Sequence, residues 1–179
     1  MKTISLTMSL LITALILLSS CGQGTKVQDD QKFYTSGIAA IELGDMDKAI
    51  ADFTTSITAN PNRREVYHRR ALAYRSLERH EEAKADLDAA IRLDPRFLGA
   101  IIARGDYNLM LGDYQAALDD FTTAIPLSPF HAESYAGKAK ALAYLGDDAA
   151  SQEALEEAVD LGYLRPRIES DISEIKSNR

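Results

Sequence analysis

The sequence predicts an all-α protein built as a stack of helix pairs, because one 34-residue pattern recurs along the chain. The segment DFTTSITANP begins at Asp52 and returns almost unchanged as DFTTAIPLSP at Asp120, with a fainter copy, DLDAAIRLDP, at Asp86. Two series of residues advance in the same step, the prolines Pro61, Pro95 and Pro129 and the turn positions Gly44, Glu78, Gly112 and Gly146. A fixed period of this length is typical of stacked units, none of which buries its apolar face alone.

Residues 1–20 are predicted to be a secretory signal peptide rather than part of the fold. Lys2 is their one charge, and it precedes an apolar run broken only by Ser and Thr. The run is too short for a comfortable membrane-spanning helix, which needs about 20 mostly apolar residues. The protein is therefore expected to be exported.

The segment Leu18-Ser19-Ser20-Cys21 resembles the lipobox of bacterial lipoproteins, whose cysteine becomes the lipidated N-terminus. The resemblance implies that Cys21 is the lipidation site and that residues 21–29 are the lipidated N-terminus and a linker to the fold. Several acyl chains together anchor a protein stably, at about 0.8 kcal/mol per buried methylene. An ordinary signal peptide with an incidental cysteine is the alternative. Gly22 replaces the Asp that retains many such lipoproteins at the inner membrane, so the periplasmic face of the outer membrane is expected in a Gram-negative organism.

Four units are predicted, over residues 30–63, 64–97, 98–131 and 132–165, each made of two helices joined by a turn. The eighth position of every unit is small and the twenty-fourth is large, namely Gly37, Ala71, Gly105 and Ala139, and Phe53, Leu87, Phe121 and Leu155. A glycine inside a helix costs about 1 kcal/mol relative to alanine, so helix propensity does not explain Gly37 or Gly105. Close packing of a large residue on a small one in each unit is the expected reason.

This pattern resembles the tetratricopeptide repeat over residues 30–165. The match includes a small residue at position twenty-seven and a proline at position thirty-two in three of the four units, namely Ser56, Ala90, Ala124 and Ala158, and Pro61, Pro95 and Pro129. The resemblance implies a right-handed α-solenoid of four helix-turn-helix repeats. Glu78 in place of a turn glycine and Asn108 in place of the preferred Tyr are departures that predict looser turns and contacts.

The fourth unit has Tyr163 where the others have proline, so the chain break is expected later, at Pro166. Ile168, Ile172 and Ile175 then share one helical face, and residues 166–179 are predicted as a C-terminal capping helix. Pro126 lies inside the second helix of unit three, and this helix is expected to end or kink near Ile125. An end effect is preferred here over a functional hinge.

No feature of the sequence favours catalysis, a cofactor, a metal or nucleic acid. His68, His80 and His131 occupy dissimilar positions in their units, and the single cysteine leaves no Cys/His ligand set. No glycine-rich phosphate loop is present. A formal net charge of −7 disfavours binding to a phosphate backbone. The chain is therefore expected not to be an enzyme.

In the resembled family, the first helix of each repeat lines a concave binding surface. Carried over to this sequence, the partner-binding groove comprises Tyr34, Ile38, Ile41, His68, Arg69, Leu72, Arg75, Ile102, Asp106, Leu109, Met110, Lys140 and Tyr144. Arg69 and Arg75 form a basic belt on an otherwise apolar wall, and they belong to a cluster of six arginines between residues 63 and 79. This cluster is either a solvated, salt-bridged helix or an anchor for an anionic peptide.

Chaperone-binding members of the family hold a C-terminal carboxylate with Lys and Asn at positions five and nine of their first unit. Tyr34 and Ile38 occupy these positions here, so that ligand is not expected. The leading hypothesis is a non-enzymatic adaptor, lipid-anchored in the bacterial envelope, that binds a segment of another envelope protein for assembly or recruitment. A peptidoglycan- or carbohydrate-binding module is the alternative, although Tyr34 and Tyr144 lie at opposite ends of the repeats. A catalytic module is disfavoured.

Overall fold

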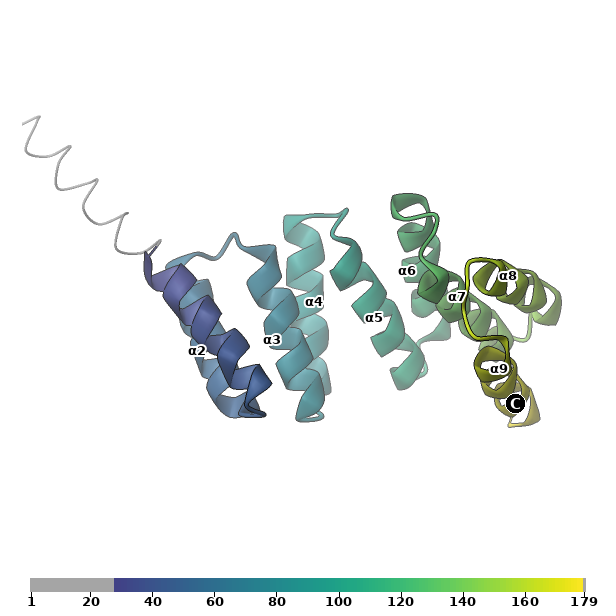
Figure 1. The fold of residues 1–179 in the computed structure, drawn as a ribbon, viewed down its shortest axis with the longest axis horizontal. Helices are drawn as coiled ribbons and strands as arrows, with labels where there is room; N and C mark the ends of the chain where they lie inside the picture. The colour runs from purple at the N-terminus through teal and green to yellow at the C-terminus, as the bar shows by residue number, and fades with distance from the viewer. Residues whose placement is uncertain (1–27, 179) are drawn as a thin grey trace, which may run out of the picture. The chain divides into compact units, whose positions relative to one another are not determined.

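The computed structural model describes residues 28–178, and all their regular secondary structure is helical (Figure 1). This confirms the all-α prediction. The chain divides into two compact units, one ending at His80 and the other beginning at Glu81. The predicted signal peptide and Cys21 lie outside the described residues. Within residues 28–178, every helix is too short or too polar to cross a bilayer.

The first unit contains a helix over residues 28–42, followed by α2 (Met46–Ala59) and α3 (Arg64–Ser76). Phe53 on α2 is fully buried in the core of this unit. A Cβ atom on Gly37 would lie 2.6 Å from Cε1 of Phe53, so only glycine lets the first helix approach α2 this closely. The contact predicted between the small eighth and large twenty-fourth positions is confirmed in this unit.

Two polar clusters hold the first helix against α2 and the start of α3. Asp30 is almost completely buried, accepts a 2.5 Å hydrogen bond from Ser56, and pairs with Arg63 at 3.3 Å. Asp52 accepts hydrogen bonds from Ser36 at 2.6 Å and from Lys48 at 2.5 Å. Both carboxylates therefore act between helices.

The second unit contains six helices, α4 (His80–Leu93), α5 (Leu98–Leu111), α6 (Tyr114–Leu127), α7 (Ala132–Leu145), α8 (Asp148–Asp160) and α9 (Arg165–Ser177). Phe121 on α6 is fully buried. A Cβ on Gly105 of α5 would lie 2.9 Å from Cζ of its ring, and one on Gly137 of α7 would lie 2.5 Å from Cε1. The ring is therefore held between two glycines, of which the repeat pattern predicted only Gly105.

The turns between paired helices use the left-handed backbone that the recurring glycines predict. Gly44, Gly112 and Gly146 have φ angles of 78°, 82° and 88°. Glu78 adopts the same region with a φ of 56°, which disfavours a residue with a side chain. The second turn thus keeps the geometry of the others at some cost in backbone strain, and the looser turn expected there is not observed.

Asn108 was expected to loosen the third repeat, but the structure shows a buried polar cluster instead. Asn108 donates to Asp120 at 2.9 Å, and Arg104 donates to Asp120 at 2.7 Å and to Asp88, also at 2.7 Å. Hydrogen bonding to Asp120 outweighs desolvation and raises the pKa of Arg104 above its ordinary value. The helices α4, α5 and α6 are thereby joined by charge-assisted hydrogen bonds.

Pro126 lies in the last turn of α6, which ends at Leu127, two residues beyond Ile125. The missing N–H therefore affects only the end of the helix. The capping helix α9 begins at Arg165 and packs on α7 and α8. Its three isoleucines, Ile168, Ile172 and Ile175, are buried in one cluster with side chains of those two helices. This arrangement gives the last repeat a covered apolar face.

Candidate functional site

In the first unit, the predicted groove residues lie on the 28–42 helix and on α3. Tyr34, Ile38 and Ile41 are half-buried and pack on the cluster around Phe53. His68 and Leu72 are half-buried on α3, whereas Arg69 and Arg75 are exposed. The side chains of α3 thus combine an apolar residue with two cationic ones on the solvent-accessible part of this unit.

Arg69 and Arg75 differ from the other arginines of the cluster in what they contact. Neither forms an ion pair with any carboxylate among the residues that the structure describes. Arg63 pairs with buried Asp30 and lies 4.0 Å from the centre of the Tyr34 ring. The remaining three are also engaged: Arg64 with Glu65 at 3.1 Å, Arg70 with Thr54 at 2.8 Å, and Arg79 with the Tyr74 ring at 4.6 Å.

The six arginines therefore fall into two classes. Four form contacts within the protein, which agrees with the interpretation of the cluster as a salt-bridged helix. The two that belong to the predicted groove keep their guanidinium groups available to a ligand.

His68 directly precedes Arg69 on α3 and is close enough to both arginines to feel their charges. Burial lowers the pKa of His68, and the positive charges of Arg69 and Arg75 lower it further. The imidazole is consequently neutral at pH 7 and adds no charge to the belt.

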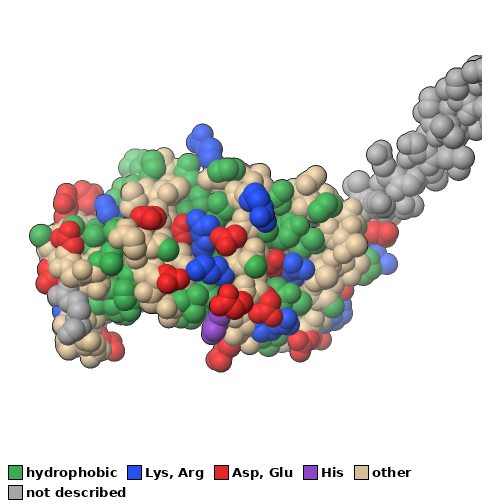
Figure 2. All heavy atoms as spheres, turned by 180° about the vertical axis from the view of Figure 1, so that it is seen from behind, with side chains coloured by type: hydrophobic (Ala, Val, Ile, Leu, Met, Phe, Trp, Pro, Cys, Tyr) green, Lys and Arg blue, Asp and Glu red, His purple; other side chains and the backbone are tan. Residues whose placement is uncertain are grey.

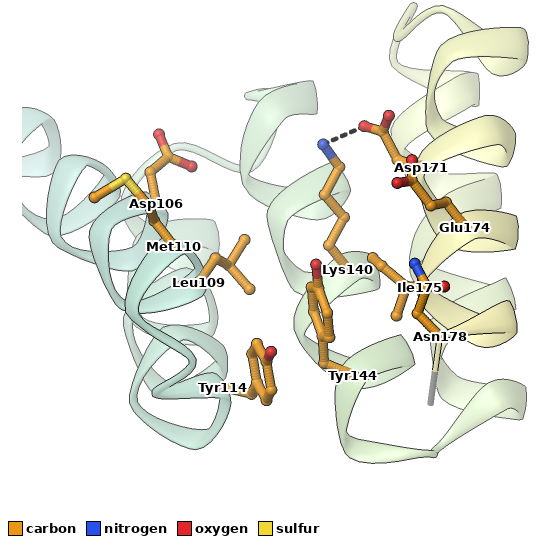
Figure 3. Close-up of a pocket in the computed structure, with 10 residues that line it drawn as sticks. All are labelled: Asp106, Leu109, Met110, Tyr114, Lys140, Tyr144, Asp171, Glu174, Ile175 and Asn178. Carbon is orange, nitrogen blue, oxygen red and sulfur yellow. Dashed lines mark ion pairs between the residues drawn. The ribbon is translucent and has the colours of Figure 1, made fainter.

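In the second unit, five of the predicted groove residues surround one hollow of about 620 Å³, namely Asp106, Leu109, Met110, Lys140 and Tyr144 (Figure 3). The sixth, Ile102, packs with Leu109 against the cluster around Phe121. The first helices of repeats three and four, α5 and α7, thus bring their predicted residues together, as the resemblance implied.

The hollow also has residues that the repeat pattern did not identify. Tyr114 stacks on Tyr144 with ring centres 4.1 Å apart and planes only 2° from parallel. The capping helix and the residue that follows it add four further residues, Asp171, Glu174, Ile175 and Asn178. Their spacing of three and four places them on one face of α9, a signal present in the sequence beyond the last repeat.

The charge in this hollow is acidic on balance. Lys140 is its one cation and forms an ion pair with Asp171, while Asp106 and Glu174 are also at its edge (Figure 3). The predicted basic belt is therefore confined to residues of the first unit. On the face drawn in Figure 2, acidic and basic side chains lie interspersed with hydrophobic ones.

The described residues provide no metal-binding constellation. No group of three or more His, Cys, Asp or Glu side chains within residues 28–178 has the proximity to hold an ion. The arrangement offers exposed cations on α3, and apolar side chains and an aromatic pair around the hollow of the second unit.

The family model of the tetratricopeptide repeat matches residues 33–63, 65–97 and 132–161, which together make up just over half of the chain. The range 98–131, with its Asn108 and Pro126, is outside the matched segments.

Human serine/threonine-protein phosphatase 5 is 33% identical over 85 residues, which are 48% of this chain but only 17% of the phosphatase. The crystal structure of MamA protein superposes with a TM-score of 0.77 at 23% identity, covering 84% of this chain and 82% of that one. The first tetratricopeptide domain of Spaghetti (RPAP3), bound to the HSP90 peptide SRMEEVD, gives a TM-score of 0.63 at 24% identity, covering 66% and 97%. These likenesses confirm the predicted fold class, a solenoid of helix-turn-helix repeats.

Proposed function

Because the chain belongs to the tetratricopeptide repeat family, we propose that it is a non-enzymatic adaptor that binds a peptide segment of another cell-envelope protein. The segment lies on the first helices of the repeats, and its acidic part is held by Arg69 and Arg75. A lipid on Cys21 tethers the adaptor to the membrane, on the periplasmic side of the outer membrane if the organism is Gram-negative. The adaptor serves in assembly or recruitment.

The observation that carries this proposal is the state of the two groove arginines. Both are exposed and without a carboxylate partner among residues 28–178, in a chain whose net charge is −7. Unpaired arginines on the predicted binding groove of an acidic protein favour a ligand that supplies the carboxylate. The planar guanidinium then donates two parallel hydrogen bonds to it.

The apolar part of the proposed contact comes from Leu72 beside the arginines on α3. Hydrophobic burial contributes about 25 cal/mol per Å² of apolar surface removed from water. A partner segment with apolar residues next to acidic ones would use both features. The RPAP3 domain, whose structure holds the acidic peptide SRMEEVD, is a precedent for peptide binding on this fold.

Peptidoglycan or another carbohydrate remains the second candidate ligand, and one observation favours it. The stacked rings of Tyr114 and Tyr144 form an aromatic surface at the edge of the hollow in the second unit. Sugar rings bind to surfaces of this kind. The two arginines of α3 have no part in such a contact.

The test is affinity capture from detergent-solubilised cell envelope with the full chain as bait. The test bait carries Arg69→Ala with Arg75→Ala. The control bait carries Arg92→Ala with Arg96→Ala, because these two arginines are also exposed and form no ion pair with a described carboxylate. The proposal expects a protein that the wild type and the Arg92/Arg96 variant retain and the Arg69/Arg75 variant loses. Recovery of glycan alone, equally by all three baits, would favour the carbohydrate candidate and reject the adaptor.

A further inference from the structure

Two large apolar side chains, Phe130 and Leu164, are exposed on the second unit although the repeat does not require them there. Phe130 is 84% exposed and Leu164 is 69% exposed. They occupy equivalent positions of the third and fourth repeats, and the first two repeats have Asn62 and Arg96 at this position, both of them exposed. The fold therefore accepts polar residues at this position, and the apolar pair needs a reason other than folding.

Both side chains border a hollow of about 370 Å³, named here the Phe130 hollow, where the loop that follows α6 meets the loop that follows α8 (Figure 1). Ala132, Leu161 and Tyr163 complete its apolar wall. A cavity of about 150 Å³ is large enough to bind benzene, so the Phe130 hollow has room for a phenyl ring. One surface thus presents both an exposed ring and a recess that a ring can enter.

The Phe130 hollow also has one carboxylate and one guanidinium among its lining residues. The carboxylate of Glu133 on α7 is exposed and lies 3.5 Å from the His131 ring, which is an ion pair only when the imidazole is protonated. Arg167 on α9 is exposed and forms no ion pair with a carboxylate of the described residues. The surface therefore carries one charge of each sign, and neither charge is neutralised by a lysine, arginine or carboxylate of the described chain.

Because this pattern is complementary to itself, we infer that the surface around the Phe130 hollow binds a second copy of the chain about a two-fold axis. A two-fold interface forms each contact twice, so one ring, one recess, one acid and one base are enough to pair every group. Each Phe130 enters the hollow of the other copy, and each Glu133 faces Arg167 of the other copy. The inference is independent of the proposed function, since Arg69 and Arg75 lie on the first unit.

The charges of the surface favour a second copy over a membrane or an acidic peptide. An anionic lipid surface attracts cations, but Glu133 offsets the attraction of Arg167. An acidic peptide would pair with Arg167 and would meet Glu133 as a like charge, which disfavours binding. A second copy brings one charge of each sign and so satisfies both residues.

Sedimentation equilibrium of the full chain in density-matched detergent micelles tests the inference. The wild type should change from monomer to dimer as the protein concentration rises. Phe130→Asp should weaken the dimer at least about tenfold, because each dimer loses two buried rings. Leu43→Asp is the matched control and should change nothing, since Leu43 is also 84% exposed but does not line the Phe130 hollow. A wild type that stays monomeric, or a dimer that Phe130→Asp leaves intact, would overturn the inference.

Charge reversal tests the two-fold arrangement itself. Glu133→Arg alone and Arg167→Glu alone each place like charges opposite one another at two points of the interface, so each should weaken the dimer about tenfold or more. The double variant restores opposite charges and should recover most of the affinity. Glu153→Arg, exposed and outside the Phe130 hollow, is the control and should leave the dimer unchanged. If the double variant is as weak as the single ones while its unfolding midpoint is that of the wild type, the two-fold pairing is wrong.

Two further results would assign the surface to a different occupant and reject the second copy. If a monomeric wild type retains an envelope protein that the Phe130→Asp variant loses, the occupant is another protein. If a monomeric chain binds vesicles of phosphatidylglycerol and phosphatidylethanolamine and the Phe130→Asp variant does not, the occupant is the membrane. Neither result bears on Arg69 and Arg75, because the affinity capture tests those residues separately.

Discussion

Gly137→Ala is the sharpest test of the packing between repeats, because two physical effects predict opposite signs. Helix propensity alone predicts a gain of about 1 kcal/mol on replacing a helix-interior glycine by alanine. The structure places the new methyl 2.5 Å from Cε1 and 2.7 Å from Cε2 of Phe121, closer than atoms can pack. The Phe121 ring is fully buried and has Gly105 at its other side, so it has no space into which to move.

The expected net effect follows from the two magnitudes. Overpacking a core costs about 1–3 kcal/mol, and the propensity gain offsets about 1 kcal/mol of this. Gly137→Ala should therefore lower the free energy of unfolding by up to about 2 kcal/mol. The midpoint of thermal unfolding should fall by roughly 2–4 °C per kcal/mol in a chain of this size.

Thermal and urea unfolding of the full chain, followed by circular dichroism, measures this change. The matched control is Phe121→Leu, alone and combined with Gly137→Ala, because a smaller side chain leaves room for the methyl. The double variant should be less destabilised than the sum of the two single ones. A higher midpoint for Gly137→Ala would show that propensity dominates and that the close approach of α7 to Phe121 is misplaced.

Three further predictions concern the anchor, a carboxylate and a turn. Cys21→Ala should abolish incorporation of labelled palmitate and leave the protein either soluble in the periplasm or uncleaved, and label that persists in this variant would reject the lipid anchor. Burial raises the pKa of Asp52, but hydrogen bonds from Lys48 and Ser36 outweigh it and hold the pKa below the usual value. Asp52→Asn should therefore destabilise the fold by about 1 kcal/mol above pH 4. Urea unfolding should show that this difference from the wild type disappears as the pH falls through the pKa of Asp52 in the folded protein. A difference that does not depend on pH would exclude the carboxylate as its source. Glu78→Gly should raise the midpoint of thermal unfolding. It relieves left-handed backbone strain of about 1–2 kcal/mol, which exceeds the cost of about 0.5–1 kcal/mol from the greater conformational entropy of glycine in the unfolded chain. A lower midpoint would contradict the φ of 56°.

The repeat and its internal contacts could be predicted from the sequence because they recur. The step of 34 residues located the turns, including Glu78, whose backbone follows the glycines despite its side chain. The packing of Phe53 on Gly37 and of Phe121 on Gly105 followed from comparing equivalent positions. Each of these contacts lies inside one repeat, where equivalent positions of the four repeats can be compared.

Contacts between repeats were harder to predict, because no equivalent position marks them. Gly137 touches Phe121 of the preceding repeat, yet its counterparts in the other units are Thr35, Arg69 and Ala103, which share neither size nor polarity. Asn108 was interpreted as a departure from the family pattern, but its amide completes a buried cluster with Asp120. A pattern averaged over repeats cannot reveal such individual pairings.

Only part of the candidate site could be predicted, because some of its residues have no equivalent position in the other repeats. Five of the residues predicted on the first helices line the hollow in the second unit, while Asp171 and Glu174 lie beyond the last repeat and outside the family pattern. The sequence also has six arginines between residues 63 and 79, but it does not show which of them form contacts within the protein. Only the three-dimensional contacts show that Arg63 is bound to Asp30 while Arg69 and Arg75 remain available. Arg63 and Arg79 are consequently poor controls for a binding experiment, although they lie outside the groove.

Titration of the captured partner against three proteins tests the central claim most directly. The proteins are the wild type, Arg69→Ala with Arg75→Ala, and Arg92→Ala with Arg96→Ala, each at two salt concentrations. Charge-assisted hydrogen bonds are worth about 1.5–3 kcal/mol each, more than exposed ion pairs at about 0–1 kcal/mol. Loss of Arg69 and Arg75 should therefore weaken binding at least about tenfold at both salt concentrations, while loss of Arg92 and Arg96 should change it little. Equal losses in the two variants that fade together as salt screens exposed charges would show a diffuse charge effect and contradict an arginine anchor on α3.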